Sequence, residues 1–257
     1  MKRILLIGLS LFVSTSVSAN AECQVVRGVF DIGSGNTKAK VALVDRCLQK
    51  IIKDLSIKEN SEKVAYKDAL KNAESFGPSV TIHGLTVIEG LKFRTESDPT
   101  IVEELKKINQ TKIQWAGIAT SAFRKATNSA EVLKKFSDTT GVAMTIIPQK
   151  DEALYGYIAG LSCAKNPKLA TVWDIGTGSQ QITSSEKTSI MLEDKASEFA
   201  KNLVLKDVLH SDAKTPNPIG IDNIGASVVT IRNALADDTL ASLGIILSKR
   251  ISCPTEI

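Results

Sequence analysis

Residues 28–38 read Gly-Val-Phe-Asp-Ile-Gly-Ser-Gly-Asn-Thr-Lys, and this stretch decides the fold. A mostly apolar run, residues 25–32, leads into the glycines, and apolar side chains alternate after them at Ala39, Val41 and Leu43. This pattern predicts two antiparallel strands joined by a glycine-rich turn. Such a turn directs several backbone N–H groups toward one point, which suits a phosphate oxygen. The predicted phosphate-binding residues of this turn are Gly33, Ser34, Gly35, Asn36 and Thr37.

The same pattern returns at residues 171–182, which read Thr-Val-Trp-Asp-Ile-Gly-Thr-Gly-Ser-Gln-Gln-Ile. A single Asp-x-Gly turn is common in hairpins, because glycine tolerates positive φ. Two copies of Asp-Ile-Gly-x-Gly instead predict two related halves that hold a phosphate chain between two turns. Asp31, and Asp174 in the second copy, end their first strands and are placed to hold a metal ion or its water. The second predicted phosphate turn consists of Gly176, Thr177, Gly178 and Ser179.

The N-terminus has the pattern of a cleaved secretion signal. Met1-Lys2-Arg3 is basic, residues 4–13 are apolar, and Ala19-Asn20-Ala21 is a typical cleavage site. The apolar core is shorter than the roughly 20 residues that span a bilayer, which argues against a membrane anchor. We expect a signal peptide at residues 1–21, cut after Ala21 or alternatively after Ala19. The mature protein is therefore predicted to be periplasmic or secreted.

Composition limits the partners. The 43% hydrophobic content supports a packed core. The net charge of +4 falls to +2 when Lys2 and Arg3 are removed, which is too mild for a nucleic acid polymer or an anionic membrane surface. A small anionic ligand at a local site fits this charge.

The four cysteines predict disulfides in an exported chain, and four cysteines allow three connectivities. Cys23 and Cys47 each lie 12 residues from Gly35, so a regular hairpin sets them opposite each other. We expect Cys23–Cys47, which leaves Cys163–Cys253. The absence of C-x-x-C spacing argues against zinc and redox chemistry.

Hydrophobic spacing predicts alternating helices and strands along the rest of the chain. Residues 50–72, dense in lysine and glutamate, indicate one or two solvated helices. Asn128 followed by Glu131 predicts a capping box at the start of a helix. The expected strands are 112–119, 142–147 and 189–192, and the expected helices are 80–94, 101–108, 129–139, 148–161, 196–209 and 222–235.

Three motifs resemble the exopolyphosphatase/guanosine pentaphosphate phosphatase (Ppx/GppA) family. They are Thr-Ser-Ala-Phe-Arg-Lys-Ala-Thr-Asn at 120–128, Ile-Ile-Pro-Gln-Lys-Asp-Glu-Ala at 146–153 and Asp-Ile-Gly-Thr-Gly-Ser at 174–179. The resemblance implies an α/β fold of two ribonuclease H-like halves, as in actin-like ATPases. The first half would span residues 22–165, with the Glu152 helix, and a shortened second half residues 166–257.

The resemblance also implies a reaction, the hydrolysis of the terminal phosphoanhydride of inorganic polyphosphate or of a guanosine polyphosphate. It assigns water activation to Glu152, a phosphate clamp to Arg124, and a Mg²⁺ ion or another divalent cation to Asp31 and Asp174. The physics agrees, because phosphoryl transfer depends on positioning and charge neutralisation. A carboxylate that orients water typically contributes ~10²–10⁴-fold.

The chain departs from the family pattern in three places. Gly35 stands where the family usually has asparagine, and Gln181 where it often has glutamate. The second half is short, so that either residues 241–251 supply a strand or the half is incomplete. These departures keep open a non-catalytic phosphate- or polyphosphate-binding protein, and a homodimer is also left open. A nucleotide-dependent kinase or ATPase ranks last, because only an isolated Gly244 appears where its late glycine-rich turn would be.

Overall fold

The computed structural model describes residues 21–58, 60–161, 164, 166, 168, 170–186, 189–193, 195–213 and 215–235. The predicted signal peptide up to residue 20, the Cys163–Cys253 pair and the possible strand at 241–251 lie outside these residues. Among the described helices, none has both the length and the apolar character that a membrane span needs.

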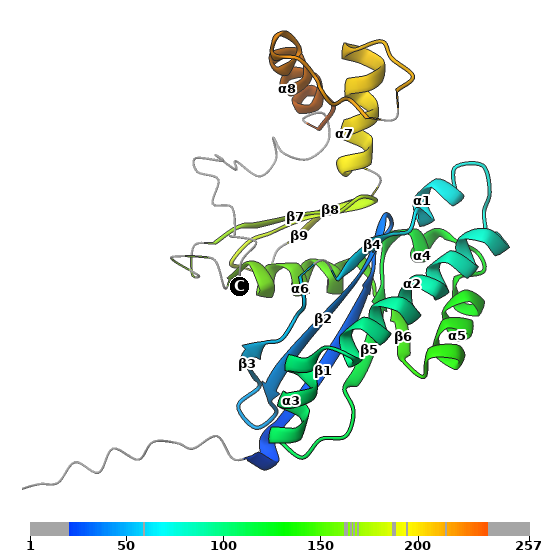
Figure 1. The fold of residues 1–257 in the computed structure, drawn as a ribbon. Coiled ribbons are helices and arrows are strands. Elements are labelled where there is room, and N and C mark those ends of the chain that lie inside the picture. Colours follow the sequence, from blue (N-terminus) through cyan, green and yellow to red (C-terminus); the bar gives the residue numbers. More distant parts are fainter. Residues whose placement is uncertain are drawn as a thin grey trace, which may run out of the picture.

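The larger sheet forms around the first glycine hairpin (Figure 1). Its strands run in the order β3-β2-β1-β5-β6, and β4 pairs with β2. β1 is antiparallel to β2 and parallel to β5, and β5 is parallel to β6, so the sheet is mixed. The bounds are β1 (Gln24–Ile32), β2 (Asn36–Asp45), β3 (Lys50–Asp54), β4 (Ser61–Lys63), β5 (Gln114–Ala119) and β6 (Ala143–Ile146).

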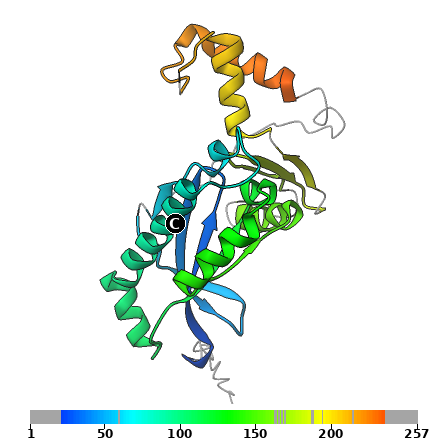
Figure 2. The same ribbon diagram turned by 90° about the vertical axis from the view of Figure 1, so that its right-hand side faces the viewer.

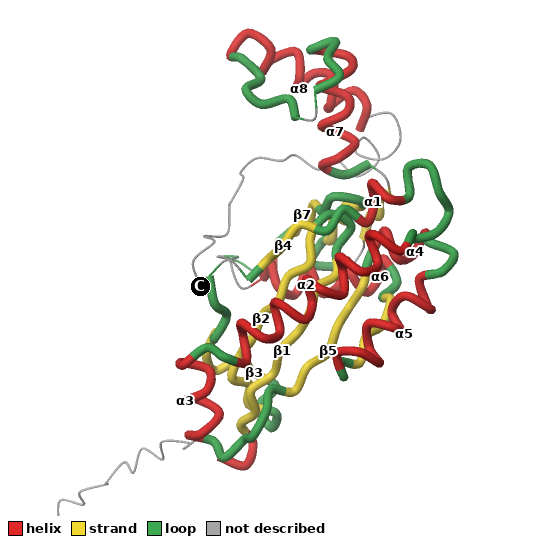
Figure 3. The backbone as a smooth tube through the Cα atoms, turned by 45° about the vertical axis from the view of Figure 1, so that its right-hand side comes forward, coloured by secondary structure: helices red, strands yellow, loops and turns green. Residues whose placement is uncertain are grey.

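Helices cover one face of this sheet, because alternate strand residues there are apolar. Phe30 and Ile32 of β1 are fully buried in a core that α2, α4 and α5 complete. A second core around Val26 is completed by α3. Figure 3 shows α2 and α3 lying across the strands. The bounds are α2 (Pro78–Glu96), α3 (Pro99–Lys107), α4 (Ser121–Lys125) and α5 (Ser129–Thr140).

The second glycine hairpin begins a smaller antiparallel sheet, in the order β7-β8-β9. α6 (Gln149–Leu161) leads from the larger sheet and lies along this one (Figure 1). A Cβ on Gly160 would come within 2.7 Å of the Val172 side chain, so glycine lets the helix approach the strand closely. The bounds are β7 (Val172–Ile175), β8 (Ser179–Thr183) and β9 (Ser189–Glu193).

A group of helices follows the smaller sheet and projects beyond it (Figure 2). It consists of α7 (Ser197–Leu203), which continues into the π-helical turn η3 (Val204–Val208), and of α8 (Ile221–Leu235). The mixed α/β architecture confirms the predicted fold class.

The prediction of helices at residues 50–72 was wrong. This segment forms β3 and β4, which pair with β2, and only the short helix α1 (Tyr66–Ala69). Every residue of β3 is exposed, so the strand has no alternation of buried and exposed side chains. Its lysines keep this edge strand soluble.

The predicted capping box was also wrong in its contacts. Asn128 stands at the start of α5, but its side chain makes no cap hydrogen bond. Its Oδ1 instead accepts from Phe76 N at 2.8 Å, and its Nδ2 donates to Phe76 O at 3.0 Å. The long-range partner therefore replaces the local one. At the other end of the helix, Gly141 has the expected left-handed conformation, with φ of 68°.

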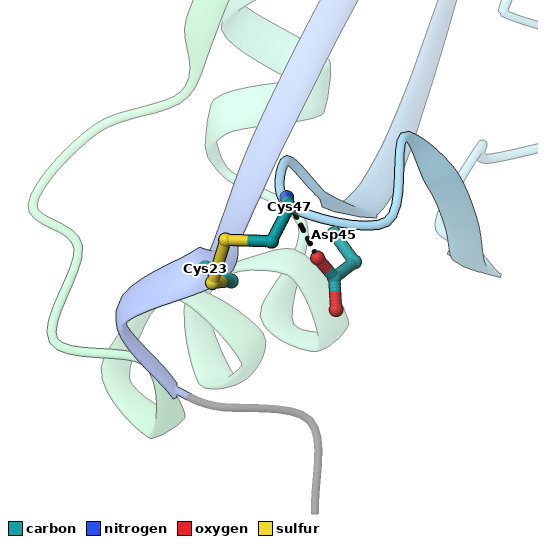
Figure 4. A group of neighbouring side chains, drawn as sticks. All are labelled: Cys23, Asp45 and Cys47. Atoms are coloured by element: carbon teal, nitrogen blue, oxygen red, sulfur yellow. Dashed lines mark hydrogen bonds between the residues drawn. A yellow bond between two sulfur atoms is a disulfide. The ribbon is translucent and has the colours of Figure 1, made fainter. Parts of the chain in front are cut away.

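The predicted Cys23–Cys47 disulfide is present, with the two Cα atoms 5.6 Å apart (Figure 4). The hairpin register pairs Gln24 with Asp45, so Cys23 and Cys47 are not directly opposed and the expected register was off by one residue. Cys47 lies in the turn after β2, where Asp45 Oδ1 accepts from the Cys47 backbone N at 2.9 Å. That turn brings the sulfur back to the start of β1.

Candidate active site

The two glycine turns have the same local geometry. Gly33 N donates to Asn36 O at 2.9 Å, and Gly176 N donates to Ser179 O, also at 2.9 Å. Each bond closes a hairpin at the point where the sequence repeats Asp-Ile-Gly-x-Gly. The duplication predicted from the sequence is therefore also present in the structure.

The turns contact each other directly. A Cβ placed on Gly35 would lie 2.9 Å from Thr177 Oγ1, and one on Gly178 would lie 2.5 Å from Ser34 Oγ. None of the turn glycines has positive φ, a conformation that among the described glycines occurs at Gly141 and Gly220. Glycine is therefore required here for close approach of the two turns rather than for an unusual backbone.

A cleft of about 440 Å³ opens where the turns meet. Thr37 is fully buried and does not belong to the cleft lining. Arg124 is also set back from the cleft lining. The predicted site residues that line the cleft are Asp31, Gly33, Ser34, Gly35, Asn36, Glu152, Asp174, Gly176, Thr177, Gly178 and Ser179.

Arg124 lies between two carboxylates. Its Nη1 donates to Glu152 Oε2 at 2.7 Å and to Ile147 O at 3.2 Å. Its Nη2 donates to Glu193 Oε2 at 3.1 Å and lies 3.4 Å from Ser179 Oγ. These contacts hold the guanidinium and fix the position of Glu152 at the first turn of α6.

Lys38 and Ser121 line the cleft and were not singled out from the sequence. Glu193 was missed as well. It ends β9, one residue beyond the predicted strand, and Ser121 Oγ donates to its Oε1 at 2.5 Å. Ser121 stands inside the quoted motif at 120–128, but nothing in its local sequence indicates a partner 72 residues away.

Burial and neighbouring charges perturb the acidic residues. Burial raises the pKa of Asp31, and the charge of Lys38, its cross-strand partner, opposes this shift. Burial also raises the pKa of Asp174, and the negative charge of Asp31 raises it further. The pKa of Glu152 is raised overall by burial, which has the largest effect, although Arg124 lowers it. The cleft therefore gathers three acidic side chains, together with Lys38, in a partly desolvated place.

The donor set fits a divalent cation. Asp31 and Asp174 line one cleft and are close enough for the charge of one to shift the pKa of the other. Mg²⁺ is commonly held by one or two carboxylates together with substrate phosphates and water. Among the described residues, one group of three acidic, histidine or cysteine side chains has its ligand atoms within 4.8 Å of one another, and it consists of Cys23, Asp45 and Cys47. Both cysteines of this group are in the disulfide.

Gln181 lies across the hairpin from Asp174. It is buried, and its Nε2 donates to Ser179 Oγ at 3.2 Å. The amide therefore supports the second turn and adds no charge beside Asp174.

Comparisons with known proteins agree with this geometry. Residues 100–197, which include Arg124, Glu152 and Asp174, match the model of the Ppx/GppA phosphatase family. No curated protein sequence gives a match. The resemblance predicted from the motifs is thus confirmed.

Solved structures share the fold at low sequence identity. The Ppx/GppA family member from Aquifex aeolicus is 18% identical with a TM-score of 0.53, and the match covers 83% of this chain and 62% of that one. An exopolyphosphatase-like protein is 16% identical with a TM-score of 0.54, over 83% of this chain and 61% of that one. The chain therefore spans about three fifths of the length of these proteins.

Proposed function

We propose that this protein is a phosphoanhydride hydrolase that releases the terminal phosphate of inorganic polyphosphate or of a guanosine polyphosphate. The observation that supports it best is that Glu152 lines the same cleft as both glycine turns. The turns supply backbone N–H groups for phosphate oxygens, and Glu152 supplies a carboxylate within the same enclosed space. The Ppx/GppA family match, over residues 100–197, covers Glu152 and the second turn.

Each residue has a role in this proposal. Asp31 and Asp174 would hold a divalent cation, which when bound neutralises charge on the phosphate oxygens. Glu152 orients the attacking water and accepts its proton, a task that its raised pKa favours. Arg124 positions Glu152 through the 2.7 Å ion pair. The phosphate clamp expected of Arg124 requires its Nη2 to leave Glu193 first.

A second candidate is a phosphate- or polyphosphate-binding protein without catalysis. The buried amide of Gln181 opposite Asp174 favours it, because a neutral group there weakens the hold on a metal ion.

Phosphate release from medium-chain polyphosphate with Mg²⁺ separates the two candidates. Glu152→Gln keeps the shape of the side chain and removes its charge, and should lower the release rate by ~10²–10⁴-fold. Asp151→Asn is the matched control, because the neighbouring acid does not belong to the cleft lining. Release that is equal in wild type and Glu152→Gln contradicts the role of Glu152 in activating water. Binding without release in both contradicts the hydrolase and supports the binding protein.

We also propose that the protein is exported. The basic and apolar N-terminus supports this, and so does the Cys23–Cys47 disulfide, which is typical of oxidising compartments. N-terminal sequencing of the mature protein should begin at Glu22. An intact Met1 on protein recovered from the cytoplasm alone contradicts the proposal.

A further inference from the structure

We infer that Glu193 is an internal competitor of phosphate, whose carboxylate takes the hydrogen-bond donors that an incoming phosphate group would use. The inference rests on the proposed function in one respect only, that the cleft binds phosphate. It adds Ser121 as a phosphate donor and Glu193 as the residue that sets the affinity for the anion.

The contacts of Glu193 are those of a bound oxyanion. Ser121 Oγ donates to one carboxylate oxygen at 2.5 Å, and Arg124 Nη2 donates to the other at 3.1 Å. A hydroxyl and a guanidinium that converge on two oxygens of one anion form the usual donor set for phosphate. Ser121 lines the cleft, and Arg124, although set back from the lining, contacts the lining residues Glu152 and Ser179, so both donors adjoin the cleft.

The local charge also points to competition. The positive charge of Arg124 is shared by Glu152 and Glu193, which leaves one excess negative charge in this group. The side chains of Arg124 and Glu193 are 16% and 31% exposed, so solvent screens this charge incompletely. An arriving phosphate therefore meets net repulsion until Glu193 moves away.

The fold allows that movement. Ser121 and Arg124 both belong to α4, beside the larger sheet, whereas Glu193 ends β9 in the smaller sheet. The competing carboxylate is therefore carried by a different sheet from its donors. A shift at the end of β9 releases Ser121 and Arg124 together and leaves the ion pair between Arg124 and Glu152 in place.

The test is the affinity for inorganic phosphate, measured by calorimetry in the presence of a chelator on the full chain. Glu193→Gln keeps the shape of the side chain and removes its charge, and we expect it to bind phosphate at least fivefold more tightly than wild type. Glu186→Gln is the matched control, because Glu186 lies exposed in the turn between β8 and β9 and the substitution makes the same charge change. A gain below fivefold, weaker binding, or no measurable binding in either protein overturns the inference.

Two further variants separate competition from a merely structural role. Ser121→Ala in the Glu193→Gln background should remove most of the gain, because it deletes one of the freed donors. Glu193→Ala removes the carboxylate altogether, so it should also tighten binding, and it serves if Glu193→Gln does not fold. Binding is measured without turnover. A wild type that never releases phosphate from polyphosphate therefore contradicts the hydrolase and leaves this result intact.

Discussion

The contact between the two glycine turns can be tested with Gly178→Ala. The added methyl group would lie 2.5 Å from Ser34 Oγ and 2.7 Å from Ser121 Oγ, whereas ordinary van der Waals contact begins at 3.4 Å. Ser34 Oγ would thus have to retreat by about 0.9 Å. It is not free to do so, because it accepts from Ala122 N at 3.1 Å in a buried position.

The cost has two parts. Overpacking a close contact costs about 1–3 kcal/mol, and leaving a buried N–H without its acceptor costs about 1–3 kcal/mol. Because the same displacement causes both, we expect Gly178→Ala to lower the free energy of unfolding by about 2–4 kcal/mol. For a chain of this size, that lowers the melting temperature by roughly 5–15 °C.

Thermal unfolding followed by circular dichroism measures this change. Gly90→Ala is the matched control, since Gly90 lies in α2 and a Cβ there meets nothing within 4 Å. Alanine at position 90 should stabilise the helix by roughly 0.5–1 kcal/mol. If Gly178→Ala melts at the wild-type temperature or above, the two turns are not in contact and do not share a cleft.

Three other predictions follow from the same site and its hairpin. Arg124→Ala leaves Glu152 without its counter-ion in a partly buried place. It should lower the free energy of unfolding by about 3–5 kcal/mol, measured by urea unfolding, and a change below about 1 kcal/mol contradicts the ion pair. Burial raises the pKa of Asp174 above its value in the unfolded chain, so its contribution to stability is present at low pH and is lost as pH rises through the folded pKa. Asp174→Asn is compared with wild type in the presence of a chelator. It should raise the melting temperature at about pH 7 and have little effect at about pH 4. Equal changes in melting temperature at the two pH values contradict the shared burial of the aspartates. Reducing the Cys23–Cys47 disulfide, which closes a sequence separation of 24 residues, should cost ~3.5 kcal/mol in the loop-entropy account, and the urea midpoint with and without reductant measures it.

The parts of the fold that could be predicted are those whose signal is local. The repeated Asp-Ile-Gly-x-Gly gave both hairpins, because strand alternation and turn glycines lie within a dozen residues. The helix predicted at 129–139 is found at 129–140 for the same reason, and its buried face includes Val132, Leu133 and Phe136 as expected. These elements depend little on the rest of the chain.

The parts that were missed depend on distant partners. β3 is an edge strand with no buried residue, so its sequence carries no alternation to find. Asn128 bonds to Phe76, 52 residues away, and Glu193 bonds to Ser121 at a separation of 72. A single sequence predicts that a polar group needs a partner, but not which one the fold brings to it.

The close fit of the two turns has a consequence for how this sequence can change over time. Gly35 accommodates Thr177, and Gly178 accommodates Ser34, so each turn supplies the space that a side chain of the other fills. A substitution that enlarges one of these positions is tolerated only if its counterpart shrinks. Among descendants of this chain, substitutions in one turn should therefore be correlated with substitutions in the other.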